Sequence, residues 1–420
     1  MNTVLEKIIL ELQKENIPSN LYVIFSKEQP SVLDVINTIK GNDRTICKPL
    51  NSNIENWVKV GEGGVNVVYD IGKGYVCRMT KNPVNYMNYQ MLDTYSVVQD
   101  KTGVMSKVKT ITMSDPLYDI VVNSIITKEL KMYPNFNTLV GSFYCDSTQK
   151  MYSIMEKNDI SLLSFIRYNF HLLSKNLLYS FVYQYAIVCY YLRYIGIVDF
   201  DRHLDNIMIK YVNSNYTNQI NTENKAINPT PFSSMSGKDR FNTDEVVTYT
   251  IKDNAGNLRH ISYRNKGLFI VPIDFGISIY ETPNIRIYNE PKAYEVTHPE
   301  CSTTYNAYEN IKGKYAKINH EIQDNVMFFF FLKNLVKVLR SGLEYYKQTS
   351  VNQEVNTFIA EMNTIFCRCF GNDGSCRVNI MTEKGDDIAL PLFYLYRNTG
   401  LPNVNMYDII TVIEKYYNGG

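Results

Sequence analysis

The sequence predicts an α+β fold in which a strand-rich first part precedes a larger helical part. Short β-branched runs separated by glycine-containing turns occupy residues 57–79, as expected for antiparallel strands. A nearly continuous apolar run from Leu177 to Tyr194 has the length and composition of a buried helix. The chain of 420 residues is long enough for two lobes, each with a core of its own.

Composition argues against several classes of protein. The 43 basic and 42 acidic residues leave a formal net charge of +1, which gives no overall attraction to nucleic acid or to an anionic membrane. The 8 cysteines are spread thinly without a zinc-binding pattern, which favours a reducing compartment. Charged residues interrupt the N-terminal apolar run, and the run Val326–Leu332 is too short to span a bilayer. We therefore expect a cytoplasmic protein.

A glycine-rich turn lies between two strand-like runs near the start of the predicted sheet. Gly61, Gly63 and Gly64 lack a Cβ, so backbone N–H groups in this turn could approach phosphate oxygens closely. An ordinary hairpin turn is the simpler alternative for these glycines. The strand that returns after Gly74 carries Arg78, a candidate cation for the same phosphates.

Two polar segments that each adjoin an apolar run form the candidate catalytic site. The first is the loop after the long helix, with Asp201, His203 and Asn206, and the second is Asp274 at the end of an apolar strand. A carboxylate can accept a hydroxyl proton, while an amide and a second carboxylate supply the oxygen ligands that Mg²⁺ prefers. A polar turn between core segments would explain either segment alone, but the presence of both favours phosphoryl transfer.

The spacing D-x-x-x-x-N from Asp201 to Asn206, followed by D-F-G at 274–276, resembles the protein kinase superfamily. The resemblance implies a bilobal fold, with an N-terminal extension at 1–50, an N-lobe at 51–156 and a C-lobe at 157–420. It implies ATP and Mg²⁺ as cofactors. Asp201 would be the catalytic base, His203 would lie near the transferred phosphate, and Asn206 and Asp274 would hold the metal.

The same resemblance extends to the predicted N-lobe. The turn at 61–68 is similar to G-x-G-x-x-G-x-V with Asn66 in place of the third glycine, which implies that Val68 lies against the nucleotide. Arg78 stands where kinases carry a lysine. The helix predicted at 115–132 should supply its acidic partner, for which we prefer Asp119 to Glu129. Residues 151–157 resemble the strand and hinge that contact adenine, which implies roles for Met155 and Glu156.

Several features leave open which molecule would accept the phosphate. The loop at 201–206 is also similar to that of phosphoinositide kinases, and the G-E-G-x-x-N turn with a strand arginine resembles inositol pentakisphosphate 2-kinases. A long insertion at about 212–265, containing a predicted hairpin, resembles the serine/threonine kinases of large cytoplasmic DNA viruses. These resemblances imply a serine/threonine kinase with a protein substrate, in the host cytoplasm or the virion with virion or host partners. The alternatives are a lipid or inositol phosphate kinase, or a nucleotide-binding pseudokinase or structural virion subunit.

Overall fold

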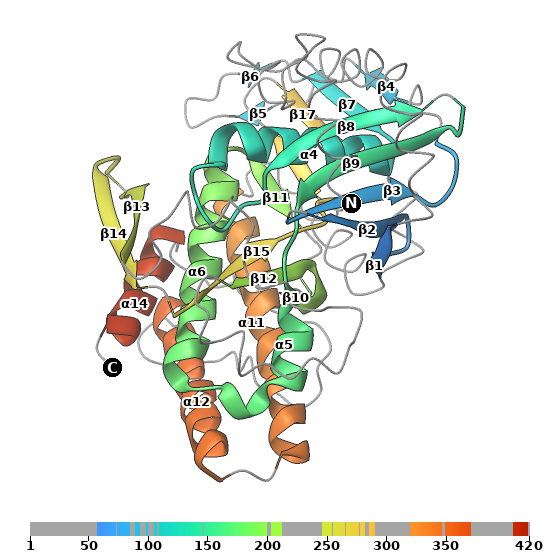
Figure 1. The fold of residues 1–420 in the computed structure, drawn as a ribbon. Helices are drawn as coiled ribbons and strands as arrows, with labels where there is room; N and C mark the ends of the chain where they lie inside the picture. The colour runs from blue at the N-terminus through green and yellow to red at the C-terminus, as the bar shows by residue number, and fades with distance from the viewer. Residues whose placement is uncertain are drawn as a thin grey trace.

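The fold is α+β, with sheets in the first part of the chain and helices in the later part, as predicted (Figure 1). We describe it from a computed structural model. The residues described are 57–72, 74–84, 89–92, 98–99, 105–106, 109–145, 147–199, 203–211, 246–253, 255–264, 266–276, 278–281, 285–289, 320–346, 349–370 and 406–418. The proposed extension at 1–50 lies outside these ranges.

The first sheet is antiparallel, with strand order β1-β2-β3-β9-β8. Its strands are β1 (Val58–Glu62), β2 (Asn66–Gly72), β3 (Tyr75–Thr80), β8 (Leu139–Cys145) and β9 (Lys150–Glu156). Gly72 and Gly74 have φ angles of 84° and 80°, a left-handed conformation that allows the tight turn between β2 and β3. Apolar side chains on one face form a small core that includes Cys77, Phe143 and Ile154.

Helix α4 (Asp115–Leu130) is buried on almost every side, which the sequence did not indicate. Pro116 lies at its first turn, as predicted. The helix contacts β8 of the first sheet and β17 of a second sheet. A helix covered on two faces needs apolar residues on both of them, and its run from Leu117 to Ile126 is mostly apolar.

The second sheet joins distant parts of the chain in the order β11-β16-β17-β7-β4. Its strands are β4 (Tyr89–Leu92), β7 (Lys109–Met113), β11 (Ile197–Asp199), β16 (Ser278–Glu281) and β17 (Ile285–Asn289). Strands β17 and β7 run parallel, with Ile287 opposite Ile111. The short strands β5 (Val98–Gln99) and β6 (Met105–Ser106) pair separately. Strands β4 to β7 were not predicted from the sequence.

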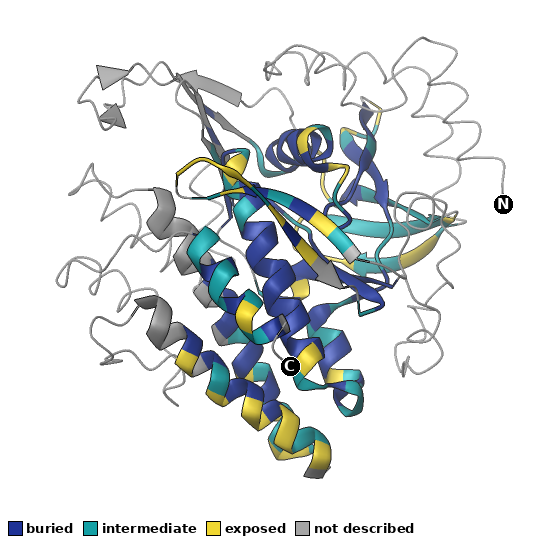
Figure 2. Cartoon of the chain, turned by 90° about the vertical axis from the view of Figure 1, so that its left-hand side faces the viewer, coloured by how far each residue is buried: buried dark blue, intermediate teal, exposed yellow. Residues whose placement is uncertain are grey.

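The later part of the chain is organised around α6 (Lys175–Tyr194), the helix predicted at 177–194. Its N-terminus is capped by Ser174, whose side chain accepts a hydrogen bond from the N–H of Leu177 at 3.2 Å. Packed on it are α11 (His320–Tyr345), α12 (Thr349–Phe370) and α14 (Met406–Asn418), and α5 (Leu162–Tyr168) adjoins α11. Buried residues line the middle of this group (Figure 2). No helix in the described ranges is long and apolar enough to cross a membrane.

The cysteines differ in their chemical state. Cys77 and Cys189 are buried free thiols, and burial raises the pKa of Cys77 to about 12. Cys145, at the end of β8, is disulfide-bonded. A disulfide is not what the thin spread of cysteines led us to expect.

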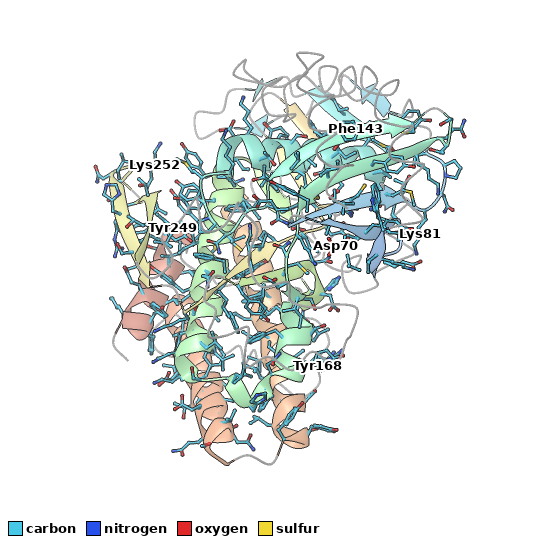
Figure 3. The ribbon with its side chains drawn as sticks, in the orientation of Figure 1. Asp70, Lys81, Phe143, Tyr168, Tyr249 and Lys252 are labelled. Atoms are coloured by element: carbon cyan, nitrogen blue, oxygen red, sulfur yellow. The ribbon has the colours of Figure 1, made fainter. Side chains whose placement is uncertain are left out.

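The hairpin predicted within the insertion is part of the packed structure. Strands β13 (Val246–Lys252) and β14 (Leu258–Arg264) form a separate sheet. Tyr249 is fully buried near Tyr191 of α6, with ring centroids 6.1 Å apart, and the hydroxyl of Tyr191 donates to the carbonyl of Thr250 at 2.8 Å (Figure 3). On the other strand, Arg259 forms an ion pair with Glu414 of α14. The predicted insertion at 212–265 therefore includes a hairpin that helps to build the helical part.

We expect that residues 212–242 can be replaced by a short Gly/Ser linker without loss of the fold. They are polar and lack apolar periodicity, and they precede the hairpin, which supplies the buried contacts. The unfolding temperature of the shortened protein should stay within about 3 °C of wild type, since long surface loops contribute little to stability. A control that also removes the hairpin at 246–264 should unfold at a much lower temperature. Loss of folded protein in the first variant would show that 212–242 pack or bind a partner.

The connection between the first sheet and the helical part is held by charged side chains. Glu156, at the end of β9, forms an ion pair with Lys210 of β12 (Ile207–Tyr211) at 2.8 Å, with both side chains buried. Strand β12 lies between β10 (Ile160–Ser161) and β15 (Leu268–Pro272). Lys157 pairs with Asp70 of β2 at 2.7 Å. The connection is therefore fastened to both parts of the fold.

Asp159 in this connection is expected to make stability depend on pH. Its carboxylate accepts a hydrogen bond from the N–H of Tyr211 at 2.8 Å, but burial raises its pKa from 3.8 to about 6. The folded state therefore binds the proton more readily, and this group's contribution to stability falls as pH rises from about 4 to above 6. Asp159→Asn should be more stable than wild type at about pH 8, by up to about 3 kcal/mol, with little difference at about pH 4.

Urea unfolding of both proteins at the two pH values measures this effect. The exposed Asp205→Asn serves as the control, and its stability should follow that of wild type. Equal stability of Asp159→Asn and wild type at both pH values would contradict the raised pKa.

Candidate active site

Arg78 lies where three elements meet. It is carried by β3, and its side chain, 14% exposed, forms an ion pair with Asp119 of α4. A second ion pair joins its Nη2 atom to Oδ1 of Asp274 at 3.1 Å, just beyond the end of β15. The structure thus brings together the strand cation, the preferred helix acid and the acid of the D-F-G segment. Glu129, the alternative partner, lies near the end of α4 and contacts Lys128.

The charges in this cluster do not cancel. Burial lowers the pKa of Arg78, but Asp119, Asp274 and Asp115 together raise it by more, so that the guanidinium stays charged. Burial raises the pKa of Asp119, and the ion pair with Arg78 opposes that shift. Three acidic side chains surround one cation, so the cluster can accept further positive charge when its carboxylates are ionised.

Backbone geometry sets the direction of Asp274. Its φ angle of 58° lies in the left-handed region, which is uncommon for a residue with a Cβ and is a local strain often seen at functional sites. The next residue, Phe275, donates its N–H to Oδ1 of Asp119 at 3.0 Å. A Cβ on Gly276 would lie 2.6 Å from Oδ1 of Asp115, so a larger residue there would require the Asp115 side chain to move. The D-F-G segment is therefore bonded to α4 through Phe275 and lies close to it at Gly276.

The loop residue Asn206 lies beside the same segment, and His203 begins the short helix that carries it. The N–H of Asn206 donates to the carbonyl of His203 at 3.0 Å, closing the short helix η4 (Leu204–Asn206). The N–H of Ile273 donates to the carbonyl of Asn206 at 2.9 Å, so Asn206 is adjacent to the residue before Asp274. Asp201 lies outside the described residues. The elements on either side of it, β11 and η4, are both in place.

The glycine turn joins β1 and β2 as predicted. The N–H of Gly63 donates to the carbonyl of Asn66 at 2.9 Å, which closes the turn. Gly61 pairs with Val68, and Val68 pairs with Arg78, so the three form a row on one face of the sheet. A Cβ on Gly63 or Gly64 would meet nothing within 4 Å, so packing does not require glycine at these two positions.

Glu156, expected to contact adenine, makes several contacts within the protein. Its backbone N–H donates to the carbonyl of Thr138 at 3.2 Å, and its side chain binds Lys210. The preceding Met155 lies within the sheet, 7% exposed, paired with Leu139 and Val76. The N–H of Glu156 is therefore engaged within the protein, and a base would have to use other atoms of the hinge.

The residues of the predicted metal site suit Mg²⁺ in chemical type. Asp274 offers a carboxylate that is 44% exposed. Asn206 carries an amide oxygen, and its backbone is hydrogen-bonded to Ile273, the residue before Asp274. Within the described ranges, no cluster of three or more His, Cys, Asp or Glu side chains is placed to hold a metal ion by itself. Mg²⁺ commonly takes one or two protein ligands and completes its shell with phosphate oxygens and water, which is compatible with such a site.

Sequence reasoning missed the part played by Asp115 and by the side chain of Asn66. Asp115 lies one helical turn before Asp119, a spacing that places both on the same face of α4 and could have indicated it. Asn66 contacts Arg78 across the strand pair β2–β3. The sequence carried no signal for that contact beyond the departure from glycine.

Comparison with known proteins adds a distant structural likeness. No family model matches the chain, and no curated protein matches it. One similar solved structure is the autoinhibited serine kinase domain of the giant muscle protein titin, with 17% sequence identity and a TM-score of 0.23. The alignment covers 36% of this chain and 38% of that chain. The fold described above has a sheet-rich first part and a helical second part.

Proposed function

We propose that this protein is an ATP-dependent phosphotransferase, and that it transfers the γ-phosphate of Mg·ATP to a serine or threonine hydroxyl of a protein. One observation carries the proposal: Arg78, Asp119 and Asp274 come from three separate elements and form one charged cluster next to Asn206. Phosphoryl transfer depends mainly on positioning and charge neutralisation, and this cluster offers both a cation for phosphates and acids for Mg²⁺.

Each residue has a separate part in the proposed reaction. Asp274 and Asn206 would hold Mg²⁺, which supplies charge neutralisation at the phosphates. Arg78 would hold phosphate oxygens, and the row of Gly61 and Val68 would lie beneath the nucleotide. Asp201 would orient the acceptor hydroxyl and take its proton, with His203 close to the transferred group.

Binding and transfer can be tested on the purified full chain. Titration calorimetry with ATP, with and without Mg²⁺, measures binding, and mass spectrometry of mixed protein substrates incubated with Mg·ATP measures transfer. We expect Mg²⁺-dependent binding that Asp274→Asn weakens at least about tenfold, since it removes a charged metal ligand. A folded wild-type protein that binds no Mg·ATP would contradict the proposal, and binding without transfer would favour a pseudokinase.

An inositol phosphate or lipid acceptor is the second candidate. The observation that favours it is the joint presence of Asn66 in the glycine turn and Arg78 on the strand, because these residues contact each other and form part of the resemblance to inositol pentakisphosphate 2-kinases. Inositol polyphosphates and phosphoinositide vesicles belong in the same substrate panel. Phosphate found only on these acceptors would replace the protein-kinase proposal. The proposed location in the virion or host cytoplasm is a separate question, and locating the protein in cells would test it.

A further inference from the structure

Two residues that depart from the kinase pattern contact each other. Asn66 stands at the position of the third glycine, and Arg78 stands at the position of the strand lysine. With the amide turned so that both partners are satisfied, the side-chain oxygen of Asn66 accepts from Nε of Arg78 at 3.1 Å and from Nη2 at 2.9 Å. The two departures therefore form one unit.

The contacts of Arg78 leave its guanidinium little freedom. Nε carries one hydrogen and each Nη carries two. The Nε edge, with Nη2, is directed at Asn66, while Nη2 also reaches Asp274 at 3.1 Å and Nη1 binds Asp119. In the described part of the chain, the guanidinium thus donates hydrogen bonds to three side chains. The plane of Arg78 is consequently fixed, and its remaining Nη1 hydrogen has a defined direction.

Asn66 is itself held by the glycine turn. Its carbonyl accepts the N–H of Gly63 at 2.9 Å, and the carbonyl of the neighbouring Val65 accepts the N–H of Lys81 at 2.9 Å. The side chain at position 66 thus links the closed turn to the cation on β3. Glycine could not make this link, and a lysine at 78 could not donate to it through two hydrogen bonds, because an ammonium lacks the paired edge of a guanidinium.

We propose that Asn66 is a positioning residue that fixes the plane of Arg78 and thereby determines how firmly this cation holds the phosphates of the nucleotide. The inference rests on the proposed function. Asn66 acts through Arg78 and need not touch the nucleotide itself. Substituting Asn66 should therefore have little effect on Mg·ATP binding when residue 78 is not an arginine that donates to its amide oxygen.

A double-mutant cycle on the full chain tests this coupling. The variants are Asn66→Leu, which keeps the approximate shape but removes the acceptor, Arg78→Lys, and the two combined. Asn66→Gln retains an amide acceptor without adding charge and is the conservative control, and Asn66→Gly is a second variant in case leucine disturbs folding. Titration calorimetry gives the dissociation constant for Mg·ATP, and thermal unfolding verifies that each variant is folded.

We expect Asn66→Leu to weaken Mg·ATP binding about tenfold in the wild-type background, the usual effect of losing a hydrogen bond to a charged group. In the Arg78→Lys background the same change should alter binding by less than about twofold. Asn66→Gln should stay within about threefold of wild type. An equal loss in both backgrounds, or no loss in either, would overturn the inference while the proposed function stands. Absence of Mg·ATP binding by the wild type would overturn both.

Discussion

Arg78→Ala is expected to lower the free energy of unfolding by about 3–5 kcal/mol and to abolish measurable Mg·ATP binding. The loss of stability follows from burial: Asp119 is 7% exposed at its side chain and would keep its desolvation cost without its cationic partner. The pair with Asp274 should contribute less, because that carboxylate is 44% exposed and partly screened by water. Arg78→Lys should reduce stability and Mg·ATP affinity less than Arg78→Ala does, because a cation remains.

Urea unfolding and calorimetry measure the two effects of Arg78→Ala. The exposed Arg167→Ala is a matched control and should change neither. Adding Asp119→Asn to Arg78→Ala should restore part of the lost stability, since the amide can still accept the N–H of Phe275 but carries no buried charge. If Arg78→Ala were as stable as wild type, or if the double variant were the less stable one, the account of this cluster as a buried ion pair would be wrong.

The parts of the fold that sequence predicted well are those with local signals. The apolar run of α6, the strands around the glycine turn and the hairpin β13–β14 each have a periodicity or turn chemistry of their own. Asp119 could be preferred to Glu129 as the partner of Arg78 because Glu129 lies in the last turn of the helix. The ion pair between them is present, while their part in nucleotide binding stays a prediction.

The parts that sequence could not predict depend on pairing between distant segments. Strand β17 lies parallel to β7 although about 170 residues separate them, and nothing in either short run specifies its partner. That pairing covers the second face of α4 and explains why the helix is buried on almost every side. The ion pair of Glu156 with Lys210 is similarly nonlocal and gives Glu156 a structural part, while its contact with adenine stays a prediction.

Asp201→Asn should reduce the rate of phosphoryl transfer by about 10²–10⁴-fold, the usual effect of removing a catalytic base, while Mg·ATP affinity stays within about twofold. The amide keeps the shape of the side chain but cannot accept the hydroxyl proton. In the proposed function, nucleotide binding would depend instead on the Arg78 cluster and on Asn206, whose carbonyl accepts the N–H of Ile273 at 2.9 Å.

Single-turnover kinetics separate this chemical step from binding, using whichever acceptor the substrate panel identifies. The control is Asp205→Asn in the same loop, an exposed residue whose carboxylate accepts a hydrogen bond from the hydroxyl of Ser161 at 3.2 Å, and its transfer rate should match wild type. Equal transfer rates in Asp201→Asn and wild type would show that another group takes the proton. A parallel loss of Mg·ATP affinity would instead assign Asp201 to the binding of the nucleotide and its metal, because a base that acts only on the acceptor hydroxyl does not alter the affinity for ATP.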